Sequence, residues 1–255
     1  MGIEYDSYQI KKNDLYDKYE FDSTVGDEAI IFCHGGAFRY GDKGDNSNFL
    51  AALSEKTSMR VYSIGYRNLD EAHSLKNMID DISVIIDSIV KTDSISHFHI
   101  MGASSGAYLV WILSIMVSNA EKFNINYDFE VDSVTLISGY FLFKRDDLIT
   151  QMFCLFPTFQ SFPQEIKSVD MDYSSYNLPP IILITGEDDG CLEDSQVLYE
   201  AVKRSNSTEI KLSVLESSLK EKADHCFLIQ IPNSEVAKQA FDQIYSFISG
   251  KVHEG

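Results

Sequence analysis

The stretch that decides the fold is Ser-His-Phe-His-Ile-Met-Gly-Ala-Ser-Ser-Gly-Ala-Tyr, residues 96–108. Its apolar first half predicts a short buried strand that ends before Gly102, and the apolar run beyond Gly106 predicts a helix. Between them, the two glycines flank Ser104 in the pattern G-x-S-x-G. A connection this tight leaves no room for side chains at the glycine positions. The pattern therefore predicts a serine hydroxyl held clear of a sheet, where it can react.

Buried strands and amphipathic helices alternate along the rest of the chain. Expected strands cover residues 29–33, 60–66, 97–101, 131–139, 180–186 and 210–215, and expected helices cover residues 46–57, 74–90, 107–117, 194–204 and 233–249. This alternation requires parallel crossovers, so the fold class is α/β, a mostly parallel sheet with helices on both faces. Aromatic and charged residues alternate over 4–22, which predicts an antiparallel edge pair. Glu193 and Asp194 are expected to cap the helix that they begin.

The length of 255 residues and the hydrophobic content of 44% are sufficient for one sizeable core. We expect residues 1–255 to form a single domain. Residues 140–178 are the least regular part, rich in aromatic residues and proline. A long insert of this kind either covers a site as a lid or packs on the sheet, and the sequence leaves both open.

Charge excludes some classes of partner. With 39 acidic and 21 basic residues the net charge is −18, which repels phosphate backbones, so we expect no nucleic-acid partner. No stretch has the about 18 apolar residues of a membrane span, and the first residues lack a signal-peptide pattern. The four cysteines lack paired spacing, which favours reduced thiols over a zinc site or disulfides. These features predict a soluble cytoplasmic protein.

Ligands of parallel sheets bind at the carboxyl ends of the strands, so residues directly after strands are the first candidates for a site. Gly35 and Gly36 follow the first buried strand in the sequence His-Gly-Gly-Ala-Phe. Glycines let backbone N–H groups approach a developing oxyanion without interference from side chains. The N–H of Ser105, directly after Ser104, is placed to supply a further donor.

A carboxylate-rich turn and a histidine follow two later strands. Gly-Glu-Asp-Asp-Gly at 186–190 offers three acids, any of which can orient a histidine. His225 lies in the loop before the final helix, where it can act as the general base for Ser104.

Together, these motifs resemble the hormone-sensitive-lipase-like branch of the α/β-hydrolases, a group of carboxylesterases. The resemblance is carried in order by HGGAF (34–38), YR (66–67), GASSG (102–106), GEDD (186–189) and HCF (225–227). It implies an α/β-hydrolase fold and a catalytic triad of Ser104, Asp189 and His225, in the chain order that this fold imposes. It also implies an oxyanion hole made by the N–H groups of Gly35, Gly36 and Ser105, and no metal or cofactor.

Three functions remain open from the sequence. The first is hydrolysis of a small carboxylic ester through an acyl-enzyme. The second keeps the triad but cleaves an amide or formamide, as in the similar kynurenine formamidase-like and small peptidase-like hydrolases. The third is a non-catalytic binding protein on a hydrolase scaffold. Relatives that have lost catalysis have usually lost the nucleophile or the base. In each case the partner is a small molecule, and a homodimer is possible.

Overall fold

The computed structural model describes residues 8–21, 26–95, 97–127, 129–143, 163, 166, 168–206 and 208–252. Within these ranges the strands form one sheet with the order β1-β2-β4-β3-β5-β6-β7-β8. The strands are β1 (Tyr8–Lys12), β2 (Tyr16–Phe21), β3 (Glu28–Cys33), β4 (Arg60–Ile64), β5 (His97–Ala103), β6 (Val131–Ile137), β7 (Ile181–Gly186) and β8 (Ile210–Leu215). All pairs from β4 to β8 are parallel, and β1 and β2 pair antiparallel at one edge. The expected sheet and its antiparallel edge are confirmed.

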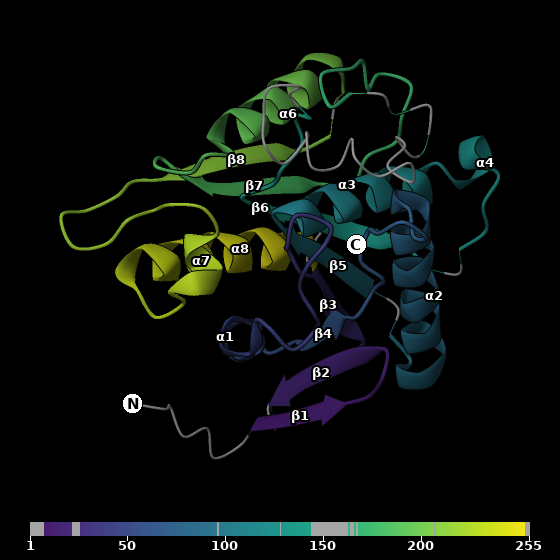
Figure 1. The fold of residues 1–255 in the computed structure, drawn as a ribbon, viewed down its shortest axis with the longest axis horizontal. Helices are drawn as coiled ribbons and strands as arrows, with labels where there is room; N and C mark the ends of the chain where they lie inside the picture. Colours follow the sequence, from purple (N-terminus) through teal and green to yellow (C-terminus); the bar gives the residue numbers. More distant parts are fainter. Residues whose placement is uncertain are drawn as a thin grey trace.

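Helices cover both faces of this sheet, as expected. They are α1 (Ser47–Thr57), α2 (Leu75–Asp93), α3 (Ser105–Ser118), α4 (Ala120–Phe123), α6 (Leu192–Ser205), α7 (Phe227–Gln230) and α8 (Glu235–Val252). Figure 1 shows α1, α7 and α8 grouped beside one face, with α2, α3 and α6 on the other. Each face therefore has its own hydrophobic core.

The alternation of side chains along β3 shows how one strand supplies both cores. Ala29, Ile31 and Cys33 join the core under α2 and α3, whereas Ile30 and Phe32 join the core under α1 and α8. All five are fully buried. Successive side chains of a strand point to opposite faces, so a strand covered on both sides must be apolar throughout. This explains the continuous apolar run that precedes His34.

Helix α3 is buried on all sides because it packs between the sheet, α2 and the segment around Tyr173. Its residues 105–116 are all buried. The ring of Trp111 lies edge-on to that of Tyr173, with 5.5 Å between the ring centroids. Because α3 begins directly after Ser104, this packing fixes the direction in which the serine leaves the sheet.

The proposed lid at 140–178 lies largely outside the described residues, and the lid prediction is not tested. Of its described part, Ile166, Val169 and Tyr173 belong to the core under α3. Within the described part of the chain, no helix combines the length and apolar character needed to cross a bilayer.

Helix α2 allows a matched test of how much one face of the fold contributes to stability. Ile79 is 1% exposed and Val84 is 67% exposed on the same helix. We expect Ile79→Ala to lower the free energy of unfolding by about 2 to 5 kcal/mol, because it leaves a cavity in the core. Val84→Ala should change it by less than about 0.5 kcal/mol. Urea denaturation followed by circular dichroism measures both, and equal losses in the two variants would contradict the assignment of the buried face.

Candidate active site

Ser104 occupies a strained turn between β5 and α3. Its backbone has φ 52° and ψ −119°, a conformation that side-chain-bearing residues rarely adopt. A Cβ on Gly102 would lie 2.3 Å from the carbonyl oxygen of Gly106, and one on Gly106 would lie 2.2 Å from that of His34. Both contacts are impossible, so the G-x-S-x-G pattern is required by packing, as the sequence predicts.

The structure brings Ser104, His225 and Asp189 into one hydrogen-bonded chain. His225 Nε2 lies 3.0 Å from Ser104 Oγ, and His225 Nδ1 lies 2.9 Å from Asp189 Oδ1. The side chain of Asp189 is fully buried, whereas that of His225 is 42% exposed. A substrate can therefore reach the serine and the imidazole while the carboxylate stays shielded from water.

Asp189 is held in place by groups other than the histidine. Thr185 Oγ1 donates to its Oδ2 at 3.0 Å, and the Cys191 N–H donates to its Oδ1 at 2.8 Å. Burial acts to raise the pKa of Asp189, but hydrogen bonds from His225, Ser138 and the Cys191 N–H outweigh it, so the pKa lies below the ordinary value. The carboxylate is thus ionised at neutral pH.

The two neighbouring acids point to a different loop. Glu187 Oε1 accepts the N–H of Ser217 at 2.7 Å, and Asp188 Oδ2 accepts the Ser217 hydroxyl at 2.8 Å. Three acids follow one another here, and only Asp189 contacts His225. Glu187 and Asp188 instead anchor the loop that leads from β8 towards His225.

The surroundings of His225 favour its protonated form. Burial acts to lower the pKa of His225, but hydrogen bonding of the ring to Asp189, Cys191 and Cys226 outweighs it, so the pKa is raised above the ordinary histidine value. A more basic imidazole is a stronger proton acceptor for a serine hydroxyl.

The glycine loop after β3 lies against the serine. A Cβ on Gly35 would be 3.1 Å from the Cβ of Ser104. Gly36 has φ +123°, and its carbonyl accepts the N–H groups of Arg39 and Tyr40, which closes the loop. Among the described residues, no hydrogen bond uses the N–H of Gly35, Gly36 or Ser105. Within the described part of the chain these three N–H groups are thus unpaired, and Gly35 and Gly36 line the same cavity as Ser104.

Two aromatic rings that the sequence analysis did not assign to the site stiffen this loop. His34 Nδ1 lies 2.7 Å from the Gly35 carbonyl oxygen. The Tyr66 ring stacks on His34 with 4.2 Å between centroids, and its hydroxyl donates to the His34 carbonyl. Burial lowers the pKa of His34, so a neutral ring donates from Nδ1 to Gly35. The signal for both residues was their place in the motifs HGGAF and YR, and Tyr66 lies just beyond the end of β4 at Ile64.

Glu193 and Asp194 lie in the first turn of α6, as expected of acidic residues at a helix start, but neither is its N-cap. Cys191 occupies the N-cap of α6, and its side chain makes no capping bond. Asp194 is buried and its Oδ1 accepts the N–H groups of Phe141 and Leu142 at 2.7 and 2.6 Å. The carboxylate therefore fixes the chain after β6 beside the serine, a contact between segments that local sequence does not indicate.

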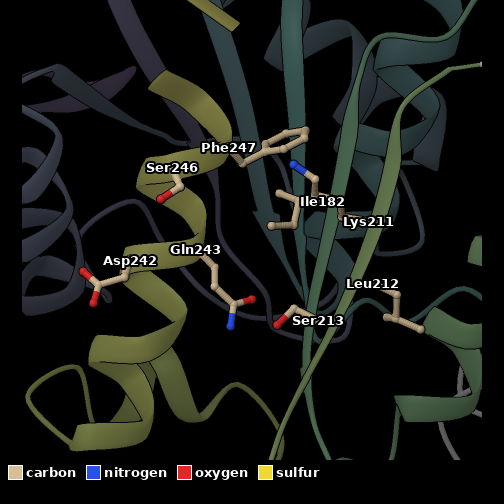
Figure 2. Close-up of a pocket in the computed structure, with 8 residues that line it drawn as sticks. All are labelled: Ile182, Lys211, Leu212, Ser213, Asp242, Gln243, Ser246 and Phe247. Carbon is tan, nitrogen blue, oxygen red and sulfur yellow. The ribbon is translucent and has the colours of Figure 1, made fainter. Parts of the chain in front are cut away.

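Two cavities differ in their relation to these residues. One of about 580 Å³ is lined by Ser104, His225, Gly35 and Gly36, together with residues of the following loop and of α7. Another, of about 450 Å³, lies between α8 and β8 (Figure 2). In Figure 2, Gln243 and Ser246 come from α8 and Ser213 from β8, and none of the lining residues belongs to the Ser104 cluster. Only the first cavity gives access to the serine.

Comparison with known proteins identifies the family. A family profile described as alpha/beta hydrolase fold matches residues 30–228. The chain belongs to this family. No curated protein sequence matches the chain. The expected fold class is thereby confirmed by the profile as well as by the sheet.

Solved structures of this α/β hydrolase's relatives agree in fold. Esterase B from Lactobacillus Rhamnosis has a TM-score of 0.81 at 18% identity, covering 97% of this chain and 86% of the other. A hormone-sensitive lipase from a metagenome library has a TM-score of 0.79 at 18% identity, with coverage of 97% and 86%. An esterase/lipase from an uncultured bacterium has a TM-score of 0.76 at 16% identity, again with coverage of 97% and 86%.

The turn around Ser104 can be tested with two glycines of this hydrolase. Gly106→Ala places a methyl group against backbone oxygens of His34 and Cys33, so we expect it to lower the free energy of unfolding by about 1 to 3 kcal/mol or more. Gly190→Ala, with nothing within 4 Å of the added Cβ, should change it by less than about 0.5 kcal/mol. Thermal denaturation measures both. A fully stable Gly106→Ala protein would show that the turn is looser than described.

Proposed function

We propose that this protein is a serine hydrolase that cleaves small carboxylic esters through an acyl-enzyme. The observation that carries the proposal is the hydrogen-bonded chain from Ser104 Oγ through His225 to the buried carboxylate of Asp189. Nucleophile, base and orienting acid in this order form the minimal machinery for acyl transfer by serine.

In the first half of the reaction, Ser104 Oγ attacks the ester carbonyl carbon while His225 Nε2 accepts the hydroxyl proton. The carbonyl oxygen becomes an oxyanion and is stabilised by the N–H groups of Gly35, Gly36 and Ser105. The imidazolium then gives its proton to the departing alcohol oxygen, and the C–O bond breaks. Ser104 remains as an acyl ester.

In the second half, a water molecule replaces the alcohol. His225 Nε2 takes a proton from this water as the water oxygen attacks the acyl carbon, and it returns the proton to Ser104 Oγ when the acid leaves. Asp189 keeps the Nδ1–H tautomer and stabilises the imidazolium in both halves. The residues named here are sufficient for the whole cycle. The partner is a small molecule, because the acidic composition of the chain would repel nucleic acid.

The names of similar structures favour an ester over an amide. Esterase B of Lactobacillus Rhamnosis was solved in a form inhibited by a tributyrin phosphonate, with a TM-score of 0.79 at 20% identity and coverage of 94% of this chain and 81% of the other. Phosphonates resemble the tetrahedral intermediate of ester hydrolysis. Turnover of a p-nitrophenyl ester compared with that of an aryl formamide separates ester from formamide hydrolysis, and inertness toward both favours a binding protein. Cytoplasmic location and a homodimer stay predictions.

Labelling of the nucleophile tests the proposal directly. A fluorophosphonate probe should label the wild-type protein covalently, because its phosphorus reacts with an activated serine. We expect Ser104→Ala to lose this labelling and at least about 10³-fold of the ester hydrolysis, while the neighbouring Ser105→Ala, which keeps its backbone N–H, still labels. In-gel fluorescence and a chromogenic ester assay provide the measurements. Unchanged labelling of Ser104→Ala would overturn the assignment.

The pH dependence tests the roles of His225 and Asp189. Only the neutral imidazole can accept a proton, so kcat/KM should rise with pH through the raised pKa of His225. Asp189→Asn removes the carboxylate that helps to raise this pKa, so the acidic limb should move to lower pH while kcat falls by about 10⁴-fold. Rates measured across the pH range in chelator-treated buffers give the midpoint of the acidic limb and the kcat of each protein. An acidic limb at the same pH in Asp189→Asn and in the wild type would contradict the coupling between Asp189 and His225.

A further inference from the structure

A thiol lies beside Asp189 and His225 and exchanges no proton in the reaction proposed above. Cys191 directly precedes α6, and its N–H donates to Asp189 Oδ1 at 2.8 Å. One ligand atom each from Asp189, Cys191 and His225 lies within 4.8 Å of the other two. Among the described residues, this is the one group of histidine, cysteine and acidic side chains with such spacing.

We propose that Asp189, Cys191 and His225 form an inhibitory binding site for a thiophilic divalent cation such as Zn²⁺. The inhibition rests on the proposed hydrolase function, whereas the binding does not.

The three side chains are the types that Zn²⁺ prefers. It takes thiolate, imidazole and carboxylate ligands at about 2.0 to 2.3 Å in a tetrahedral arrangement. Asp189 Oδ1 and His225 Nδ1 are 2.9 Å apart in a hydrogen bond, and the Cys191 sulfur lies within 4.8 Å of the ligand atoms of both residues, so small movements of these side chains would let all three contact one ion. The side chain of His225 is 42% exposed, so an ion can approach from the side of the imidazole.

Buried partners hold part of this site in place before an ion arrives. Thr185 Oγ1 donates to Asp189 Oδ2, so the acid stays oriented when its other oxygen changes partner. Such supporting hydrogen bonds orient metal ligands and raise affinity.

Binding at this place would stop the chemistry through the tautomer of His225. The ion takes the Nδ1 lone pair, which is available only when the ring proton sits on Nε2. The proton therefore leaves Nδ1 and a proton is held at Nε2, while the thiol proton of Cys191 passes to solvent. An imidazole protonated at Nε2 cannot accept the proton of Ser104, so the nucleophile is no longer activated.

Zinc titration of the intact protein tests the inhibition. After treatment with a chelator, hydrolysis of p-nitrophenyl butyrate is measured against ZnCl₂ concentration, with each variant normalised to its own uninhibited rate. We expect Cys191→Ser to raise the half-inhibitory zinc concentration by at least about 10-fold. Loss of a group that only supports a metal ligand already lowers metal affinity by about 10-fold or more, and loss of a ligand should lower it at least as much. Cys226→Ser, which removes the other thiol beside His225, should stay within about 2-fold of wild type. Equal inhibition of wild type and Cys191→Ser would overturn the site.

Cobalt binding tests the site without relying on catalysis. Co²⁺ bound to a thiolate gives a charge-transfer absorption band in the near ultraviolet. We expect this band with the inactive Ser104→Ala protein and its absence in Ser104→Ala/Cys191→Ser. A band in Ser104→Ala together with a wild-type protein inert toward esters would leave the metal site standing and remove the hydrolase function. An active wild-type esterase without the band would do the reverse.

Discussion

β5 turns into α3 through Ser104 alone, whose backbone has the left-handed φ of 52°. The turn requires glycine at positions 102 and 106, because a Cβ at either position would overlap backbone oxygens. It is held from outside as well, since the Ser104 N–H donates to the Ile137 carbonyl of β6 and its own carbonyl accepts the Tyr140 N–H. Strain of this kind persists only where the surroundings over-determine it. The buried helix α3 and the central position of β5 supply those surroundings.

The other parts of the site follow from where the neighbouring strands end. β3 lies beside β5, so the loop of Gly35 and Gly36 meets the serine at the same edge of the sheet. Asp189 follows β7, which lies beyond β6 in the sheet. The loop after β8 returns across this edge and places His225 in contact with Asp189 and Ser104. The parallel order of the sheet therefore converts distant positions in the chain into one cluster.

Most of the fold and the central residues could be predicted from the sequence because their signals are local. The central strands β3 and β7 are nearly continuous apolar runs, and G-x-S-x-G and His-Gly-Gly are short motifs set by backbone packing. The choice of Asp189 over Glu187 and Asp188 came from the family resemblance, because three adjacent carboxylates look alike without their partners. Asp194 was misread and Tyr66 was not assigned to the site, since both act through segments far away in the chain.

The bond between His225 and Ser104 joins positions 121 residues apart. The first part of the chain carries Ser104 and the loop of Gly35 and Gly36, and the last part carries Asp189 and His225. Under the proposed function, a ribosome-bound chain that has released only its first strands would hold an unactivated Ser104, because Asp189 and His225 are still to come. On the same proposal, the serine would become reactive only when β7, β8 and the loop that carries His225 have folded onto the sheet, so activity would mark the completion of folding.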